Sequence, residues 1–463
     1  MFKKEVYKSR RDRLAKKFES GVLLFLGNSE AFLTDSGNAY KFRNNSSFLY
    51  FYGYNEPDMA GVIDIDSGEE IFFGNDVTMD DIIWMGHLPK TQEKAERVGI
   101  ARSEQMSELE DYLRKAKNAG RKIHFLPPYR YQTRMLLNKM LAIPFDEMDA
   151  AASVDLIKAV VSMRLIKEEC EIEEIDKACD IGYLMHYTVM RMARLGMSER
   201  ELYGIMSGVA LSHGFYTSFP TILSQNGETL HNHSHHQILT EGRMMVIDAG
   251  VESLTHYASD NTRTLPSSGK FTDRQKDVYQ IVVDANNLNH KLARPGISYT
   301  SVHQEVSKLI ATGLKNLGLL KGDVEDIVAN GAHSLFMPHG LGHNMGLDVH
   351  DMQDLGEDYV GYDDKYHRST QFGLNALRMG KLLEPGHVVT DEPGIYFIPA
   401  LIDKWEAEGI NKDFVNFDKL KSYYDFGGIR LEDDILITKD GSRLLGHKRI
   451  PIAIAEVEET MKH

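Results

Sequence analysis

The 463-residue sequence predicts two domains: an α/β domain over residues 1–160 and a larger α+β domain over residues 161–463 that contains an internal duplication. The chain is too long for one ordinary hydrophobic core. Helical and strand patterns alternate in the first part, whereas in the second part long amphipathic helices twice precede strand hairpins. With 42% hydrophobic residues, 26% charged residues and no low-complexity tract, the composition is typical of a soluble globular protein.

The elements of the first domain follow from local patterns. A charged helix is expected over residues 8–19 and strands over 22–26, 61–65 and 70–73. Helical patterns recur over 103–119 and 130–141. Because the character of the sequence changes near residues 159–167, we place the domain boundary there.

The second domain begins with a long amphipathic helix predicted over residues 167–195, in which Ile172, Ile175, Cys179 and Gly182 share one side. Similar helical blocks cover residues 273–292 and 299–317, so each half of the domain has helices before its strands. Residues 351–380 are charged, and we predict that they form a surface insertion.

Charge and cysteine usage exclude several classes of protein. The net charge of −15, with no compensating block of Lys and Arg, argues against a nucleic-acid binder. The N-terminus carries charges where a signal peptide needs an apolar core, and no apolar run reaches the length of a membrane span. Cys170 and Cys179 lie on one predicted helix, too far apart to pair. These features predict reduced thiols and a cytoplasmic location.

Two stretches of the second domain, residues 239–250 and 383–394, echo each other. Each ends an apolar run on a carboxylate, Asp248 or Glu392, and each is followed by a strand-like segment with a second carboxylate, Asp260 or Glu432. Either aspartate alone is as readily a turn residue. The repetition favours a functional interpretation, because four clustered carboxylates would repel one another without cations. The pattern predicts a shared site for two divalent ions.

Histidines lie between the two echoing units, in residues 338–343. Gly340 and Gly342 argue against the helical zinc motif, and their spacing to Gly346 does not fit a dinucleotide loop. A glycine-rich extended segment can instead aim His343 at a metal. An oxygen-rich set with one imidazole suits Mn²⁺, with Co²⁺ or Zn²⁺ as substitutes. Four carboxylates neutralise two such ions, which would acidify a bridging water for hydrolysis.

A histidine-rich run spans residues 231–236. Such runs are more often solvated loops than metal sites, and we expect this for most of the run. His231 is the exception, because of the resemblance described next.

The motifs resemble those of the proline-specific metallopeptidases of the pita-bread fold, aminopeptidase P and prolidase, over nearly the whole chain. The resemblance implies a pita-bread catalytic domain. It implies that five residues bind metal, with the second and fifth bridging the two ions: Asp248, Asp260, His343, Glu392 and Glu432. It further implies that His231, His339 and His350 surround the substrate, support the tetrahedral intermediate or carry protons, and that Arg430 orients Glu432.

The two ends of the chain resemble different subfamilies. Residues 42–57 follow the aminopeptidase P pattern, and Trp84 falls in a segment similar to one that lends a tryptophan to a neighbouring subunit's active site, which implies a homodimer or homotetramer. The segment 396–402, with Tyr396 as a substrate contact, matches prolidase better. Arg378 stands where prolidases hold a dipeptide's carboxylate, whereas Asp391 replaces the usual apolar residue of both subfamilies.

The sequence therefore predicts a dinuclear hydrolase that removes the N-terminal residue from peptides with proline in second place, an Xaa-Pro aminopeptidase. In this interpretation Glu392 also takes the proton of the attacking water. The alternative within the class is an Xaa-Pro dipeptidase. A metal-free binding module or a creatinase-like enzyme of the same fold is disfavoured by the intact ligand set, and methionine aminopeptidases lack the N-terminal domain.

Overall fold

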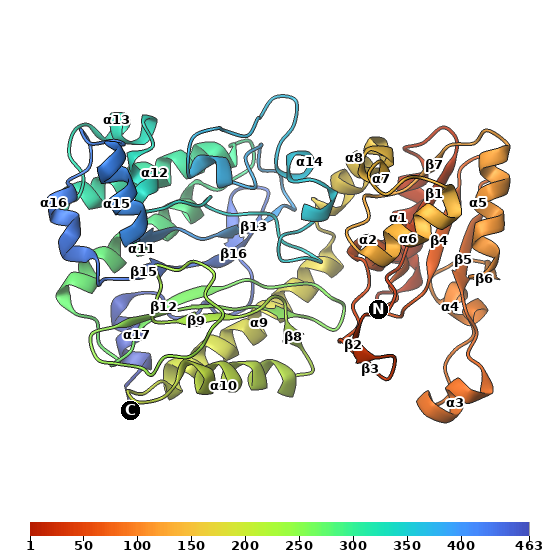
Figure 1. Ribbon diagram of the computed structural model, residues 1–463, viewed down its shortest axis with the longest axis horizontal. Coiled ribbons are helices and arrows are strands. Elements are labelled where there is room, and N and C mark those ends of the chain that lie inside the picture. The colour runs from red at the N-terminus through yellow and green to blue at the C-terminus, as the bar shows by residue number, and fades with distance from the viewer. Residues whose placement is uncertain (463) are drawn as a thin grey trace. The chain divides into compact units, whose positions relative to one another are not determined.

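The computed structural model describes residues 1–462, which form two compact units (Figure 1). The N-terminal unit comprises Met1–Arg164 and the short segment Met352–Tyr359. The C-terminal unit comprises Leu165–Asp351 and residues 360–462. The chain thus leaves the first unit at Arg164 and returns to it for eight residues before completing the second.

The N-terminal unit is built on a mixed five-stranded sheet in the order β6-β5-β4-β1-β7. The central strands consist almost entirely of buried apolar residues, which is why they form the middle of the sheet. The strands are β1 (Val22–Leu26), β4 (Ala60–Asp64), β5 (Glu70–Gly74), β6 (Arg102–Gln105) and β7 (Ile123–His124), with a separate hairpin of β2 (Phe32–Asp35) and β3 (Asn38–Ala39).

Eight helices accompany this sheet among the described residues 1–164. They are α1 (Lys4–Ala15), α2 (Ser46–Tyr52), α3 (Met79–Met85), α4 (Thr91–Arg97), α5 (Glu108–Asn118), α6 (Tyr131–Leu141), α7 (Met148–Ala151) and α8 (Val154–Arg164). The helix predicted over 103–119 is shorter than expected, because its first residues form the edge strand β6. Leu109 and Leu113 of α5 belong to the core of this unit.

Helix α3 differs from the other helices of the unit in burying none of its residues. A capping box between Thr78 and Asp81 fixes its N-terminus. Its apolar side chains face solvent, with Trp84 87% exposed and Ile83 69% exposed. An apolar helix that contacts no core of its own presents a surface that another molecule can cover.

The C-terminal unit repeats one arrangement twice. The first half contains α9 (Glu169–Met192), α10 (Glu199–Ser212), β8 (Tyr216–Thr217), β9 (Ile222–Ser224), β10 (Met244–Asp248), β11 (Val251–Glu252) and β12 (Thr262–Pro266). The second half contains α11 (Asp273–Leu292), α12 (Tyr299–Asn316), α13 (Val324–Ala329), β13 (Val388–Asp391), β14 (Gly394–Tyr396), α15 (Pro399–Glu408), α16 (Phe417–Leu420), β15 (Gly428–Arg430), β16 (Asp433–Ile437), β17 (Ser442–Leu444) and α17 (Ile454–Thr460). Figure 1 shows α9 and α10 on one side of the strands and α11 and α12 on the other.

Hydrogen bonds at the helix junctions confirm the duplication. The N–H of Gly196, after α9, donates to Leu239 O, and the N–H of Gly296, after α11, donates to Leu383 O, each at 3.0 Å. The next helix of each half is capped by a serine, Ser198 or Ser298. The two echoing sequence stretches therefore occupy equivalent positions in the two halves.

The ligand-bearing strands of both halves are antiparallel pairs. Strand β10 pairs with β12 so that Asp248 lies opposite Thr262, and β13 pairs with β16 so that Asp391 lies opposite Asp433. Three-stranded sheets result, β12-β10-β9 and β13-β16-β17, with two-stranded β14-β15 and β8-β11 beside them. A backbone bridge between Thr262 and Glu432 joins the halves, with the N–H of Glu432 donating to Thr262 O at 2.9 Å.

The prediction that residues 351–380 form a surface insertion is wrong. The 3₁₀ turn Gln353–Leu355 and helix α14 (Glu357–Gly361) bury apolar side chains, whereas the 3₁₀ turn Leu374–Ala376 buries none of its residues. The buried residues of the segment include Leu355, Tyr362, Leu377 and Met379. The segment is charged in composition, yet Leu377 and Met379 belong to the core of the C-terminal unit, so part of it can reach a functional site.

Two further expectations concern cysteines and membranes. Cys170 and Cys179 both lie on α9 and are free thiols. Within residues 1–462, no helix combines the length and apolar character that crossing a membrane would need.

Candidate metal centre

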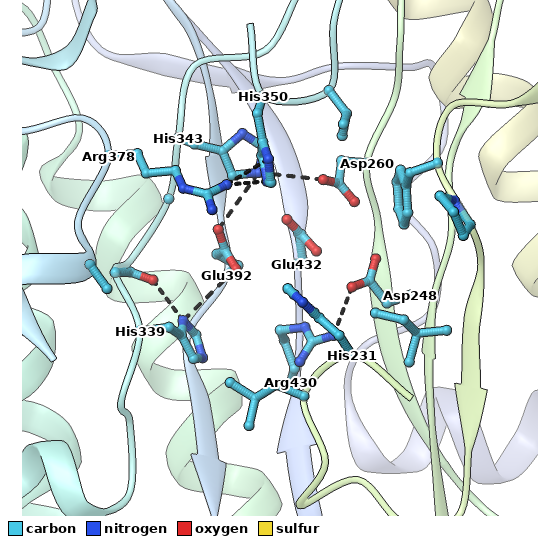
Figure 2. A pocket seen from close by; sticks show the side chains of 18 of the residues that line it. His231, Asp248, Asp260, His339, His343, His350, Arg378, Glu392, Arg430 and Glu432 are labelled. Carbon is cyan, nitrogen blue, oxygen red and sulfur yellow. Dashed lines mark hydrogen bonds and ion pairs between the residues drawn. The ribbon is translucent and has the colours of Figure 1, made fainter. Parts of the chain in front are cut away.

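A pocket of about 310 Å³ lies in the C-terminal unit and gathers ten of the residues predicted from the sequence (Figure 2). The ten are His231, Asp248, Asp260, His339, His343, His350, Arg378, Glu392, Arg430 and Glu432. Figure 2 shows the four carboxylates pointing towards a common centre from different strands. Residues more than 200 positions apart in sequence thus meet at the seam of the two halves.

Strand ends place the four carboxylates. Asp248 is the last residue of β10, and Glu392 directly follows β13. Asp260 precedes β12, and Glu432 lies between β15 and β16. The strand-like segment predicted around Glu432, residues 427–435, is therefore interrupted at Glu432. Before this residue the chain pairs with β14 as β15, and after it the chain pairs with β13 as β16.

The glycines around His343 allow this segment to run against β13. A Cβ at Gly342 would lie 2.1 Å from Thr390 O, so no other residue fits there. The Thr390 N–H donates to His343 O at 3.0 Å, and the His343 N–H donates to Thr390 Oγ1 at 3.1 Å. The imidazole Nε2 of His343 lies 3.4 Å from Asp260 Oδ2 and 3.7 Å from Glu392 Oε1. The structure confirms that this segment is not helical.

Three of the side chains already have the spacing of a metal site. Asp260, His343 and Glu432 each offer one ligand atom, and these atoms lie within 4.8 Å of one another. All three residues are buried. Asp248 and Glu392 line the same pocket beside them.

The electrostatics of the centre favour cations. Burial, reinforced by the other carboxylates, raises the pKa of Asp260 and of Glu432 well above the ordinary range. Burial also raises the pKa of Glu392. Oδ1 of Asp248 and Oδ1 of Asp260 are buried and have no hydrogen-bond partner among residues 1–462. Buried oxygens without partners and mutually repelling carboxylates fit divalent ions, which satisfy both.

Arg430 supports both halves of the centre. Its Nη2 donates to Asp248 Oδ2 at 2.7 Å, and its Nε donates to Thr262 Oγ1 at 3.2 Å. Thr262 Oγ1 in turn donates to Glu432 Oε2 at 2.7 Å. Arg430 therefore contacts Asp248 directly and reaches Glu432 only through Thr262, a residue that sequence reasoning did not identify.

Three histidines of the pocket are neutral near pH 7. Burial lowers the pKa of His339 and of His343 to about 4, and burial also lowers the pKa of His231. His339 Nδ1 donates to Gly340 O at 2.7 Å, so its Nε2 accepts from the Tyr396 hydroxyl at 3.0 Å. Tyr396 also accepts from Arg430 Nη1 at 2.8 Å. A hydrogen-bonded chain thus links His339 to the arginine.

The histidine-rich run is more ordered than expected. His233 lines the pocket beside His231, although sequence reasoning had not selected it. His235 is buried, with its ring stacked on Tyr203 at 4.5 Å, so the solvated-loop interpretation is wrong for that residue. His236 is exposed and contacts Arg200, in agreement with that interpretation.

The remaining predicted residues are divided between the two units. Arg378 lines the pocket, where its guanidinium contacts the His350 ring. Apolar lining comes from Phe219, Leu230 and Val349, which no motif indicated. Trp84 lies on α3 of the N-terminal unit and does not line this pocket.

Comparison with known proteins identifies the architecture. Residues 173–439 match the model of metallopeptidase family M24, and residues 7–124 match the aminopeptidase P N-terminal domain. The chain is 31% identical to the Xaa-Pro aminopeptidase of Escherichia coli over 96% of its length and 94% of that protein. It is 29% identical to the human Xaa-Pro dipeptidase over 94% of its length and 86% of that protein.

Solved structures give the same result. Zinc-substituted Escherichia coli aminopeptidase P in complex with product aligns with a TM-score of 0.82 at 30% identity, covering 99% of this chain and 98% of that one. Proline aminopeptidase P II from Yersinia pestis aligns with a TM-score of 0.81 at 30% identity, covering 99% of each chain. The predicted pita-bread catalytic domain and aminopeptidase P-like N-terminal domain are confirmed, and the chain belongs to metallopeptidase family M24, in the aminopeptidase P and prolidase group.

Proposed function

We propose that this protein is an Xaa-Pro aminopeptidase, a metal-dependent hydrolase that releases the N-terminal residue from peptides whose second residue is proline. One observation carries the proposal: five ligand-type side chains converge in one pocket of a chain that matches aminopeptidase P relatives over nearly its full length. Peptides are therefore the partners of this pocket.

The proposed ligands of two divalent ions are Asp248, Asp260, His343, Glu392 and Glu432. The neutral imidazole of His343 has a lone pair available for a metal because its Nδ1 lies 3.1 Å from Asn344 O, which fixes the tautomer. The oxygen-rich set favours Mn²⁺, with Co²⁺ or Zn²⁺ as substitutes. When bound, such ions supply Lewis acidity, which lowers the pKa of water and polarises a carbonyl.

The protein's own groups divide the remaining work. Glu392 lines the pocket and accepts the proton of the attacking water. His231 and His350 face the pocket and donate hydrogen bonds to the developing oxyanion. His339 is oriented by Tyr396, and Arg430 holds Asp248 in place.

A second candidate, Xaa-Pro dipeptidase, is favoured by Arg378. Its guanidinium lines the pocket beside His350, and it can bind a dipeptide's terminal carboxylate through two hydrogen bonds. Longer peptides carry no carboxylate at that position. The contribution of Arg378 to binding therefore separates the two activities.

The assembly we propose is a homodimer or homotetramer in which Trp84 of one subunit reaches the active site of a neighbour as a substrate contact. Its exposure on an apolar helix that buries nothing supports this role. We also propose a cytoplasmic location, which is consistent with two free cysteines.

A comparison of three substrates tests the function. The protein, purified without chelator, should contain roughly two metal ions per chain by elemental analysis. It should cleave Xaa-Pro-Yaa peptides but not matched Xaa-Ala-Yaa peptides. Preferential cleavage of Xaa-Pro dipeptides would replace the aminopeptidase assignment with dipeptidase. A protein with neither metal nor hydrolysis would be a binding module of the same fold.

A further inference from the structure

Behind the pocket, a second polar cluster lies on the opposite face of the strands that carry Glu392 and Glu432. Neighbouring residues of a strand point to opposite faces, so Asp391 and Asp433 point away from the pocket. The two are cross-strand partners, and both are buried. Each therefore sits directly behind one proposed metal ligand.

The two buried carboxylates are neutralised differently. Asp433 accepts from Arg263 Nη2 at 2.6 Å and from Arg449 Nη2 at 2.9 Å. Asp391 has no arginine. Its one ion-pair partner within residues 1–462 is His290, whose Nε2 lies 3.1 Å from Asp391 Oδ2 and 3.9 Å from Asp433 Oδ2. The imidazole of His290 thus lies near both Asp391, which precedes Glu392, and Asp433, which follows Glu432.

His290 belongs to a polar stripe on α11 that contacts the end of β13. Asn286, Asn289 and His290 share one helix face by their spacing. Asn286 Nδ2 donates to Asp391 O at 3.3 Å. Asn289 Nδ2 donates to the Tyr299 hydroxyl at 2.8 Å, and that hydroxyl donates to Thr390 O at 2.6 Å. All three side chains therefore act on the two residues immediately before Glu392.

The first half of the duplication lacks this stripe. Aligning Ala193 and Gly196 with Ala293 and Gly296 makes Met190 the counterpart of His290, and the echoing strands make Ile247 the counterpart of Asp391. Met190 and Ile247 are fully buried in one hydrophobic core. The helix residue and the strand residue are thus both apolar in the first half, as Met190 and Ile247, and both polar in the second half, as His290 and Asp391. Because apolar pairs are commonly as stable as buried ion pairs, stability alone does not account for the polar pair.

We propose that His290 is a positioning residue, which holds Asp391 and thereby fixes the backbone that presents Glu392 to the metal site. The inference rests on the proposed assignment of Glu392 as a ligand. His290 itself is not among the residues that line the pocket. Its role is to keep the end of β13 at the spacing from Glu432 that the ligand set requires.

Cobalt binding to metal-depleted protein tests this inference without reference to activity. The double variant His290→Met with Asp391→Ile copies the apolar pair of the first half. We expect it to melt at the wild-type temperature or above, but to bind Co²⁺ at least tenfold more weakly and with an altered visible absorption spectrum. His290→Gln keeps an N–H donor and should stay within about threefold of wild type, whereas His290→Met alone should not.

The matched control is Met190→Leu with Ile247→Val, which alters the corresponding core positions and should leave Co²⁺ binding unchanged. Wild-type Co²⁺ affinity and spectrum in the double variant would overturn the inference, as would equal behaviour of His290→Gln and His290→Met. Glu392→Gln separates the two levels of the argument. If it fails to weaken Co²⁺ binding, the ligand assignment itself is wrong and the inference falls with it.

Discussion

The two halves of the C-terminal unit repeat one backbone arrangement but support their proposed metal ligands differently. In the first half, Asp248 is the last residue of its strand, and the residue before it, Ile247, is packed in an apolar core. Arg430 from the other half hydrogen-bonds the Asp248 carboxylate. In the second half, Glu392 follows Asp391, which is held by a polar helix face. The comparison teaches that duplication fixes where ligands stand, whereas the contacts that hold them have diverged.

The largest effect is expected from removing the carboxylates nearest the seam. Glu432→Ala should abolish turnover, because this side chain belongs to the group of three whose proposed ligand atoms lie within 4.8 Å of one another. Circular dichroism should show a retained fold. If the halves contribute equally, Asp260→Ala will match it in activity and metal content. Substantial activity with full metal content in Glu432→Ala would refute the ligand assignment.

The loops before the ligand strands are also comparable, and the first-half loop carries His231. His231→Ala should lower kcat by roughly 10²-fold with metal content unchanged, since the imidazole acts on the transition state. His236→Ala is the matched control from the same run, because its side chain is exposed and contacts Arg200. Equal activity of the two variants would return His231 to an ordinary loop residue.

The corresponding loop of the second half carries Arg378, and its effect should be smaller and selective. Arg378→Ala should cost Xaa-Pro dipeptides about 1.4 kcal/mol, or tenfold in kcat/KM, through loss of the contact to the terminal carboxylate. Tripeptides should stay within about twofold. If the wild type prefers dipeptides and Arg378→Ala removes nearly all of its dipeptide activity, the protein is a dipeptidase. No effect on either substrate would exclude a role for Arg378 in substrate binding.

The last expected effect is on stability rather than on turnover, and it is a pH dependence shared by both halves. Between pH 7 and 8 His339 and His343 are neutral in the folded state, because burial lowers their pKa to about 4, and unfolded histidines, with a pKa of about 6.5, are also mostly neutral there. Burial raises the pKa of Asp434 to about 8 and that of Asp260 and Glu432 well above the ordinary range. The metal-free folded state therefore binds more protons than the unfolded state, and its free energy of unfolding falls as pH rises.

Urea denaturation of chelator-treated protein at pH 7 and pH 8 measures this slope, which is at most about 1.4 kcal/mol per pH unit for each group. Added Mn²⁺ should remove it, because cations favour the ionised carboxylates. Asp260→Asn and Glu432→Gln should reduce it equally if the halves are equivalent. Unequal reductions would show which of the two carboxylates has the more strongly raised pKa. A free energy of unfolding that does not change with pH in the absence of metal would contradict the expectation that the folded state binds more protons than the unfolded state.

The sequence predicted the four pocket carboxylates because the motif is repeated, and each copy ends an apolar strand on an acid. It also predicted the extended glycine-rich segment around His343. It could not predict Thr262 as the link between Arg430 and Glu432, because that contact depends on which strands meet across the seam. His233 was overlooked because histidine-rich runs are usually solvated.

Other differences have the same physical origin. The segment 351–380 was taken for a surface insertion because its charges obscured its few buried apolar residues, such as Tyr362 and Met379. The pairing of His290 with Asp391 joins residues about a hundred positions apart and follows no local periodicity. Local sequence patterns therefore predicted the helices, the strands and the types of the proposed ligands. The side chains that contact one another between different strands and helices could be identified only from the three-dimensional structure.

The backbone bridge between Thr262 and Glu432 has a consequence for how the protein is made. Neither half alone holds all five proposed ligands, and Glu432 is translated long after Asp248 and Asp260. While the ribosome is still synthesising the second half, the emerging chain exposes no finished hydrolytic site to nearby nascent peptides. Peptidase activity thus switches on only when the last strands close against the first, so the order of translation itself delays the enzyme until its fold is nearly complete.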